Sequence, residues 1–169
     1  NYTGGAGDDS LTFGHSLVIE GGTATFNMSL GGNNTFVAGN YAASSSGSIE
    51  YTGGSGDDNL TFGEYLAGSG TATLDLGSDS AIDTVTFEGI VAASGGNVSI
   101  NNFGLGDSIV LQIFSNTDDV DLTATGVSDT RVTGTNVNFV ISGVSTGSLG
   151  LTTNSSGYVV ITDAGSITV

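Results

Sequence analysis

Two nearly identical nine-residue segments constrain this chain more than any other feature. GGAGDDSLT runs from Gly4 to Thr12, and GGSGDDNLT runs from Gly53 to Thr61. Glycines allow the backbone to turn at positive φ and leave carbonyl oxygens uncovered by side chains. The apolar residues that follow at alternate positions, such as Leu60 and Phe62, are typical of a strand with one buried face. Each segment therefore predicts a glycine-rich turn that leads directly into a β-strand.

These segments belong to a repeat of about fifty residues, which divides again in two. Tyr2-Thr3-Gly4-Gly5 recurs as Tyr51-Thr52-Gly53-Gly54, an offset of 51 − 2 = 49 residues. Glycine-rich turns with Asp or Asn recur about every 24 residues. A second, plainer kind of turn lies between them, at Glu20–Gly22, Asn40–Ser48, Ala67–Gly70 and Glu88–Gly96. We therefore expect two strands per coil and an all-β, right-handed parallel β-solenoid or β-roll. The glycine-rich turns are Gly4–Asp9, Gly31–Asn34, Gly53–Asp58, Gly77–Asp83 and Gly104–Asp107.

The solenoid is predicted to occupy residues 1–114 and to contain about five coils. Residues 115–169 have no such turns, and we expect them to form a C-terminal β cap or small sheet. Its strands are expected at Val120–Thr125, Val137–Ser142, Ser148–Thr152, Tyr158–Thr162 and Ser166–Val169. Alternation assigns the inward positions. The expected core is Leu11, Phe13, Leu17, Ile19, Phe26, Met28, Leu30, Phe36, Ile49, Tyr51, Leu60, Phe62, Leu66, Leu74, Leu76, Val85, Phe87, Val98, Ile100, Phe103, Ile109 and Leu111.

The glycine-rich turns are candidate calcium sites. Carboxylates and backbone carbonyls are hard oxygen ligands, and Ca²⁺ lies ~2.4 Å from each ligand. Twice that distance is about the ~4.8 Å between strands, so one ion fits between the turns of successive coils. Ordinary Asx turns are the alternative interpretation of the same residues. The expected ligands are Gly4, Ala6, Asp8, Asp9, Asn33, Asn34, Gly53, Ser55, Asp57, Asp58, Asp79, Asp83, Gly104 and Asp107.

The amino-acid composition limits which partners the chain can bind and which chemistry it can perform. The chain has 17 Asp and Glu against one basic residue, so nucleic acid and anionic membranes are poor partners, and no apolar run is long enough for membrane insertion. There is no Cys, and a metal ion is the obvious substitute for disulfides outside the cell. One His, one Arg and no Lys leave few groups for catalysis, and we expect no enzyme. The start at Asn1 predicts a fragment or a processed form.

GGAGDDSLT and GGSGDDNLT resemble the calcium-binding nonapeptides of the RTX family of bacterial type I-secreted proteins. LGSDSAIDTVTF and NFGLGDSIVL resemble segments of RTX-type surface-layer (S-layer) proteins, and the resemblance covers about Asn1–Leu111. RTX rolls have nonapeptides in tandem, whereas these are about forty residues apart, which favours an S-layer-like or adhesin-like solenoid over a toxin roll.

The resemblance implies a non-catalytic structural protein, exported by type I secretion to the bacterial cell surface, that self-assembles with Ca²⁺ into a lattice. Its expected partners are several calcium ions, copies of itself and a cell-surface polysaccharide. Three alternatives stay open: a calcium-stabilised adhesin or matrix-filament module, the calcium-roll domain of a secreted hydrolase, and an ice-binding solenoid. The last is disfavoured because Thr-x-Thr pairs are too sparse to form an array on every coil. They occur at Thr23–Thr25, Thr71–Thr73, Thr84–Thr86 and Thr123–Thr125.

Overall fold

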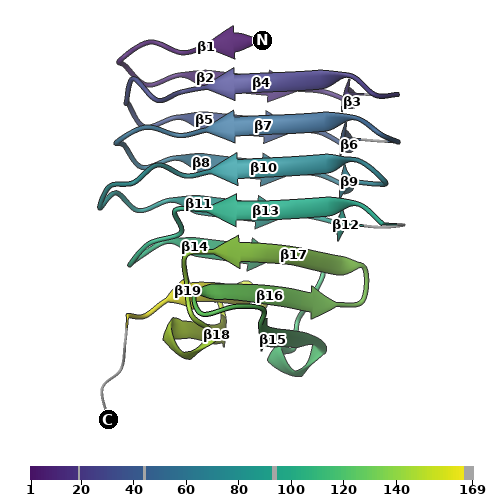
Figure 1. The fold of residues 1–169 in the computed structure, drawn as a ribbon, viewed down its shortest axis with the longest axis vertical. Helices are drawn as coiled ribbons and strands as arrows, with labels where there is room; N and C mark the ends of the chain where they lie inside the picture. Colours follow the sequence, from purple (N-terminus) through teal and green to yellow (C-terminus); the bar gives the residue numbers. More distant parts are fainter. Residues whose placement is uncertain (19, 44, 93–94, 166–169) are drawn as a thin grey trace.

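Short runs of alternating apolar and polar residues form the strands of a parallel β-solenoid of about four turns (Figure 1). The computed structural model describes residues 1–18, 20–43, 45–92 and 95–165. Three sheets run along the solenoid, which we name A, B and C. Sheet A contains β1 (Tyr2–Thr3), β4 (Thr23–Asn27), β7 (Ser48–Thr52), β10 (Thr71–Asp75) and β13 (Asn97–Asn101). Sheet B contains β2 (Ser10–Phe13), β5 (Thr35–Ala38), β8 (Asn59–Phe62), β11 (Thr84–Phe87) and β14 (Ser108–Leu111). Sheet C contains β3 (Ser16–Val18), β6 (Tyr41–Ala43), β9 (Tyr65–Ala67) and β12 (Ile90–Ala92).

Successive coils stack in one continuous register. Phe13 pairs with Ala38, Ala38 with Phe62, and Phe62 with Phe87. A coil therefore contains 38 − 13 = 25, 62 − 38 = 24 or 87 − 62 = 25 residues. The predicted parallel stacking is confirmed, and Phe13 and Phe62 lie two coils apart as expected.

Each coil has three strands, whereas the sequence analysis predicted two, and there are about four turns instead of five. The chain bends after each of the first four parallel strands of sheet B, and the short strands of sheet C occupy residues assigned to plain turns or their flanks. At one bend the carbonyl of Gly14 lies so close to Gly39 that a Cβ there would clash. Sheet C escaped prediction because its buried residues include adjacent alanines, Ala42 and Ala43, which do not alternate.

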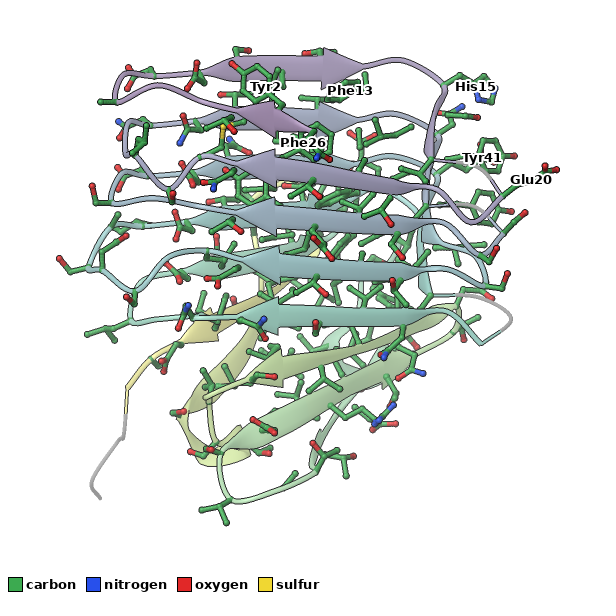
Figure 2. All side chains as sticks on the ribbon, turned by 45° about the horizontal axis from the view of Figure 1, so that its top comes forward. Tyr2, Phe13, His15, Glu20, Phe26 and Tyr41 are labelled. Atoms are coloured by element: carbon green, nitrogen blue, oxygen red, sulfur yellow. The ribbon has the colours of Figure 1, made fainter. Side chains whose placement is uncertain are left out.

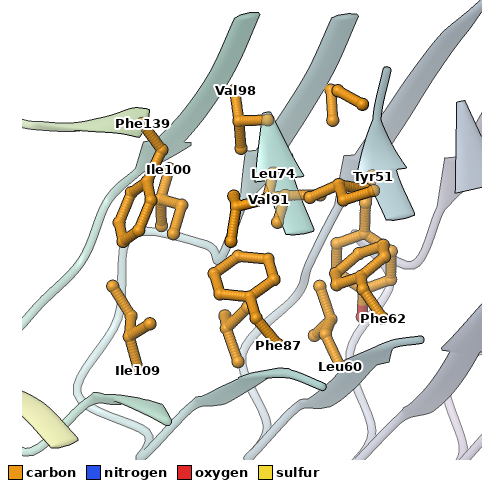
Figure 3. Close-up of a cluster of buried hydrophobic side chains, with 14 of the residues drawn as sticks. Tyr51, Leu60, Phe62, Leu74, Phe87, Val91, Val98, Ile100, Ile109 and Phe139 are labelled. Atoms are coloured by element: carbon orange, nitrogen blue, oxygen red, sulfur yellow. The ribbon is translucent and has the colours of Figure 1, made fainter. Parts of the chain in front are cut away.

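The core is a column of aromatic and aliphatic side chains between the sheets (Figure 3). Phe36 lies 5.8 Å from both Phe13 and Phe62, measured between ring centroids, and Phe62 lies 5.8 Å from Phe87. Most of the predicted core is buried. Leu30 is the clear error, because it lies in a turn and is 63% exposed. Ile19 lies outside the described residues. Leu11, Phe13 and Leu17 are only partly buried.

The partial burial of those three residues reflects their place in the first coil. Among the described residues, strand β2 pairs only with β5 and β3 only with β6, so their side chains have neighbours on one side. Figure 2 shows Tyr2, Phe13 and Phe26 at this end, with His15 and Tyr41 at an outer corner.

The C-terminal end is covered by strands that reverse direction. In sheet A, β17 (Val137–Ser142) is parallel to β13, and β16 (Asp129–Gly134) and then β15 (Val120–Ala124) follow antiparallel. In sheet B, β19 (Val159–Asp163) is antiparallel to β14, and β18 (Leu149–Thr153) completes the sheet. The sequence analysis missed β16, and its final strand at Ser166–Val169 lies outside the described residues. Within the described part of the chain, no helix is long and apolar enough to cross a membrane. Two short 3-10 helices, η1 (Thr117–Asp119) and η2 (Thr146–Ser148), lie between these strands.

Candidate metal-binding edge

The turns that lead from sheet A into sheet B lie along one edge of the solenoid, on the left of Figure 1. We call this surface the turn edge; it consists of residues 4–9, 28–34, 53–58, 76–83 and 102–107. Each turn places an Asp or Asn directly before the sheet B strand. We call these residues the inner row: Asp9, Asn34, Asp58, Asp83 and Asp107. The residue before each of the first four forms the outer row: Asp8, Asn33, Asp57 and Ile82.

The inner row forms a continuous hydrogen-bond ladder between coils. Oδ1 of Asn34 accepts the N–H of Asp9 at 3.1 Å, and Oδ1 of Asp58 accepts the N–H of Asn34 at 3.0 Å. The same bond joins the N–H of Asp58 to Asp83 at 2.7 Å and the N–H of Asp83 to Asp107 at 2.9 Å. The side chains thus satisfy backbone donors that the turn would otherwise leave without a partner.

The outer row forms a second ladder that runs in the opposite sense. Oδ1 of Asp8 accepts the N–H of Asn33 at 2.8 Å, Oδ1 of Asn33 accepts the N–H of Asp57 at 3.0 Å, and Oδ1 of Asp57 accepts the N–H of Ile82 at 2.8 Å. An outer-row side chain therefore binds the coil that follows it, whereas an inner-row side chain binds the coil before it. The outer ladder stops at Ile82, whose side chain has no acceptor.

The glycines of the nine-residue segments make room for the inner-row carboxylate. Oδ2 of Asp58 accepts the hydroxyl of Tyr51 at 2.9 Å, and the Asp58 carboxylate also accepts the backbone N–H of Gly54. A Cβ on Gly53 would lie 2.7 Å from that Oδ2, so only glycine fits there. The first segment repeats the tyrosine and backbone contacts around Asp9. The packing of the Asp carboxylate thus accounts for the Tyr and the Gly of the motif without a metal ion.

Tyr51, Tyr2 and the backbone of Gly54 are site residues that the sequence analysis did not assign. The signal was present, because Tyr-Thr-Gly-Gly precedes the Asp in both segments. The hydroxyl's role depends on a seven-residue separation that brings Tyr51 back over Asp58, and only the folded turn shows it.

Burial disfavours the charged form of three inner-row carboxyl groups, those of Asp58, Asp83 and Asp107. Asp58, Asp83 and Asp107 are between 1% and 2% exposed. Burial raises the pKa of all three carboxyl groups, and for Asp83 the pKa reaches about 7. Backbone hydrogen bonds oppose the rise at each group, and nearby carboxylates reinforce it at Asp83 and Asp107. Desolvation and the Asp58 carboxylate also raise the pKa of the Tyr51 hydroxyl, so it remains a donor.

The predicted ligands all fall on the turn edge, but they differ in access. The carboxylates of Asp8, Asp57 and Asp79 are exposed, as are Ala6 and Ser55 near the tips of their turns. Asp79 belongs to neither row, and its side chain accepts the N–H of Ala81. Gly4 and Gly53 are buried beneath the inner row, and Gly104 donates its N–H to Oδ2 of Asp107 at 2.7 Å.

The donors of the turn edge suit calcium in kind: carboxylates, amide oxygens and glycine carbonyls repeat in the successive turns. Each ladder oxygen already accepts an N–H, and a carboxylate oxygen has a further lone pair. Among the described residues, no group of three or more Asp, Glu, His or Cys side chains is placed to hold an ion. An ion here must therefore take carbonyl or amide oxygens beside one or two carboxylates.

No pocket is found in the described part of the chain. The imidazole of His15 stacks on Tyr41 at 5.3 Å, and Tyr41 stacks on Tyr65 at 5.1 Å, on the exposed corner next to sheet C.

Comparisons with known protein families, with characterised proteins and with solved structures found no match.

Proposed function

We propose that this chain is a non-catalytic structural module of a secreted bacterial surface protein, which binds calcium along the turn edge and associates with copies of itself into a surface layer (S-layer). The observation that supports this proposal is the inner row. Asp58, Asp83 and Asp107 follow one another in successive coils of a chain that has a net charge of −16.

The electrostatic cost of that row favours a bound cation. Two unit charges one strand spacing apart repel by about 3–4 kcal/mol at the effective dielectric constant of ~20 that is typical near protein surfaces. Successive carboxylates in the inner row accept hydrogen bonds from backbone N–H groups, but the described residues show no cationic side chain among these contacts. A divalent cation relieves the repulsion without removing the ladder.

Calcium binding on this edge would couple to folding. The turn edge exists only when the coils are stacked, so ions bind the folded chain far better than the open chain. Extracellular calcium modules typically have dissociation constants of ~0.1–1 mM. The chain is therefore expected to be loose at low calcium and to fold and associate at the millimolar calcium of many extracellular media.

The first experiment is a calcium titration of chelator-treated protein, followed by circular dichroism and light scattering. The β signal is expected to rise first, and scattering is expected to follow at higher calcium or protein concentration. A chain that is fully folded in excess chelator, and unchanged by calcium, would refute the proposed coupling.

A matched pair of variants tests the site. Asp57→Asn keeps an oxygen for the N–H of Ile82, as Asn33 does in the same row, and removes one exposed carboxylate. Asp121→Asn removes an exposed carboxylate from β15, which is the last strand of sheet A in the C-terminal cap and contributes no residue to the turn edge. Isothermal titration is expected to show a lower calcium affinity, or fewer bound calcium ions, for Asp57→Asn only. Equal losses in both variants would mean that calcium responds to net charge and has no site at Asp57.

Electron microscopy of protein with and without millimolar calcium separates the structural alternatives. Ordered two-dimensional arrays are the result expected for a surface layer, whereas fibres would favour the adhesin or matrix-filament module. Particles that stay monomeric while calcium stabilises the fold would favour a calcium-roll domain attached to another activity.

A further inference from the structure

The outward face of the five parallel strands of sheet B has no charged residue. One outward row on these strands consists of Thr12, Val37, Thr61, Thr86 and Val110, which occupy one register position. The other row runs from Ser10 to Ser108 and contains only Ser, Thr and Asn. We call these two rows the neutral face. All its side chains are exposed or partly exposed, and they are small or β-branched.

Sheet A, the turn edge and the corners next to sheet C bear carboxylates, whereas the short strands of sheet C themselves contain none and offer a narrower face of three residues per strand. Sheet A presents Glu50 and Asp75 on its outward side. The corners next to sheet C bear acidic residues that include Glu64 and Glu88. The turn edge bears the acidic rows described above. Because the chain has 17 acidic and two potentially basic side chains, Arg131 and His15, contact between copies at those surfaces brings like charges together.

We infer that copies of this chain contact each other through the neutral face, which lies against the same face of a second copy. This inference rests on the self-association proposed above and names the surface responsible. The methyl groups of Thr and Val exclude water at such a contact, and the flanking hydroxyl and amide groups can pair across it. A contact between identical faces is isologous, so it closes on a pair and leaves other surfaces free for further lattice contacts.

The size of the neutral face predicts a weak individual contact. Five strands at ~4.8 Å and four residues at ~3.3 Å give about 24 × 13 ≈ 310 Å² per copy, or about 600 Å² per pair. Stable complexes bury about 1,200–2,000 Å². Pairing by this face alone should therefore be transient in dilute solution and persist only where an array repeats it.

The acidic rims around the neutral face make pairing dependent on cations. The Debye length, beyond which repulsion between exposed charges is largely screened, is about 10 Å at 0.1 M salt and about 3 Å at 1 M salt. Calcium bound on the turn edge, or high salt, should thus promote pairing without touching the neutral face itself.

The test compares Thr61→Lys with Thr73→Lys. Thr61 lies at the centre of the neutral face, whereas Thr73 is an equally half-buried outward threonine on sheet A, and both changes add the same charge. Circular dichroism and thermal melting establish that both variants are folded. Sedimentation velocity and electron microscopy in millimolar calcium then measure association. Thr61→Lys is expected to weaken association by at least about tenfold, because the contact would bury an unpaired ammonium group, whereas Thr73→Lys assembles like the wild type. Thr86→Lys, on the next strand, should repeat the defect.

The outcomes separate this inference from the proposed function. If the wild type forms no assembly with calcium, both the proposed self-association and this inference are refuted. If the wild type assembles and Thr61→Lys assembles equally well, the proposed function stands and the neutral face is not the contact. If the wild type stays monomeric but slows ice recrystallisation, and Thr61→Lys abolishes that effect, the face binds ordered water and the contact between copies is refuted.

Discussion

Replacing Asn34 by alanine should test whether the inner row stabilises the solenoid. The Asn34 side chain accepts the N–H of Asp9 and donates to the carbonyl oxygen of Gly32 at 3.0 Å and to Oδ1 of Asp58 at 2.9 Å. It is 1% exposed, so water does not replace these bonds. Loss of two neutral bonds at about 1 kcal/mol each and one charged bond at about 1.5–3 kcal/mol predicts a loss of about 3–5 kcal/mol in the free energy of unfolding.

Asn40→Ala is the control for that change. Asn40 belongs to the same coil but lies exposed beyond sheet B at the opposite corner, and the same atoms are removed. Urea denaturation in excess chelator, at fixed pH, measures both variants without any contribution from bound metal. Asn40→Ala should change the free energy of unfolding by less than about 0.5 kcal/mol, as exposed substitutions usually do.

A third variant separates the hydrogen bonds from the charge. Asn34→Asp keeps an acceptor for Asp9 but places another carboxylate one coil from Asp58. It should be destabilised in chelator and partly restored by calcium. If Asn34→Ala costs no more than Asn40→Ala, the ladder does not stabilise the fold and the reasoning is wrong.

Three further predictions concern Asp83, Gly39 and Phe36. Burial raises the pKa of Asp83 from 3.8 to about 7, so ionisation of this carboxyl group disfavours the folded state. In excess chelator, the free energy of unfolding should therefore fall as the pH rises from 4 through 7. Urea titrations of Asp83→Asn should show a flatter dependence on pH. Gly39→Ala should destabilise the solenoid by roughly 3 kcal/mol through a backbone clash, whereas Gly7→Ala, which meets nothing within 4 Å, should melt near the wild-type temperature. Phe36→Ala should cost about 3–5 kcal/mol in chemical denaturation because Phe36 is fully buried; a cost below about 1 kcal/mol would contradict the described core.

The stacking was predictable because two periods coincide in the sequence. Alternation assigned Phe36, Leu60 and Val85 to the interior, and the recurrence of glycine-rich turns fixed the coil length at about 24 residues. The third strand was not predictable in this way, since a strand of three residues such as Tyr41–Ala43 is too short to show a period. Leu30 was misassigned because alternation was extended past the end of its strand into a turn.

The candidate site was predictable in its location and less so in its chemistry. Sequence spacing placed Asp9, Asp58 and Asp107 on one edge, which the register confirms. The same residue types serve as calcium ligands and as acceptors for backbone N–H groups, so the pattern alone does not separate the two roles. Asn34 in the inner row illustrates this, because its amide oxygen accepts the N–H of Asp9 and is also of a type that binds calcium. Calcium binding stays a prediction.

The uniform register of the coils has a consequence for the order in which the chain acquires structure. In sheets B and C each parallel pairing between coils closes a loop of 24 or 25 residues, and in sheet A the pairings from β1 to β13 close loops of 23 (71 − 48) to 26 (97 − 71) residues. Each added coil therefore has nearly the same entropic cost. A pair of stacked coils can therefore act as a template for the next coil, and the chain folds by adding one coil at a time in steps of nearly equal length. A coil that pairs with a neighbour on one side only is where such a process would most easily run in reverse.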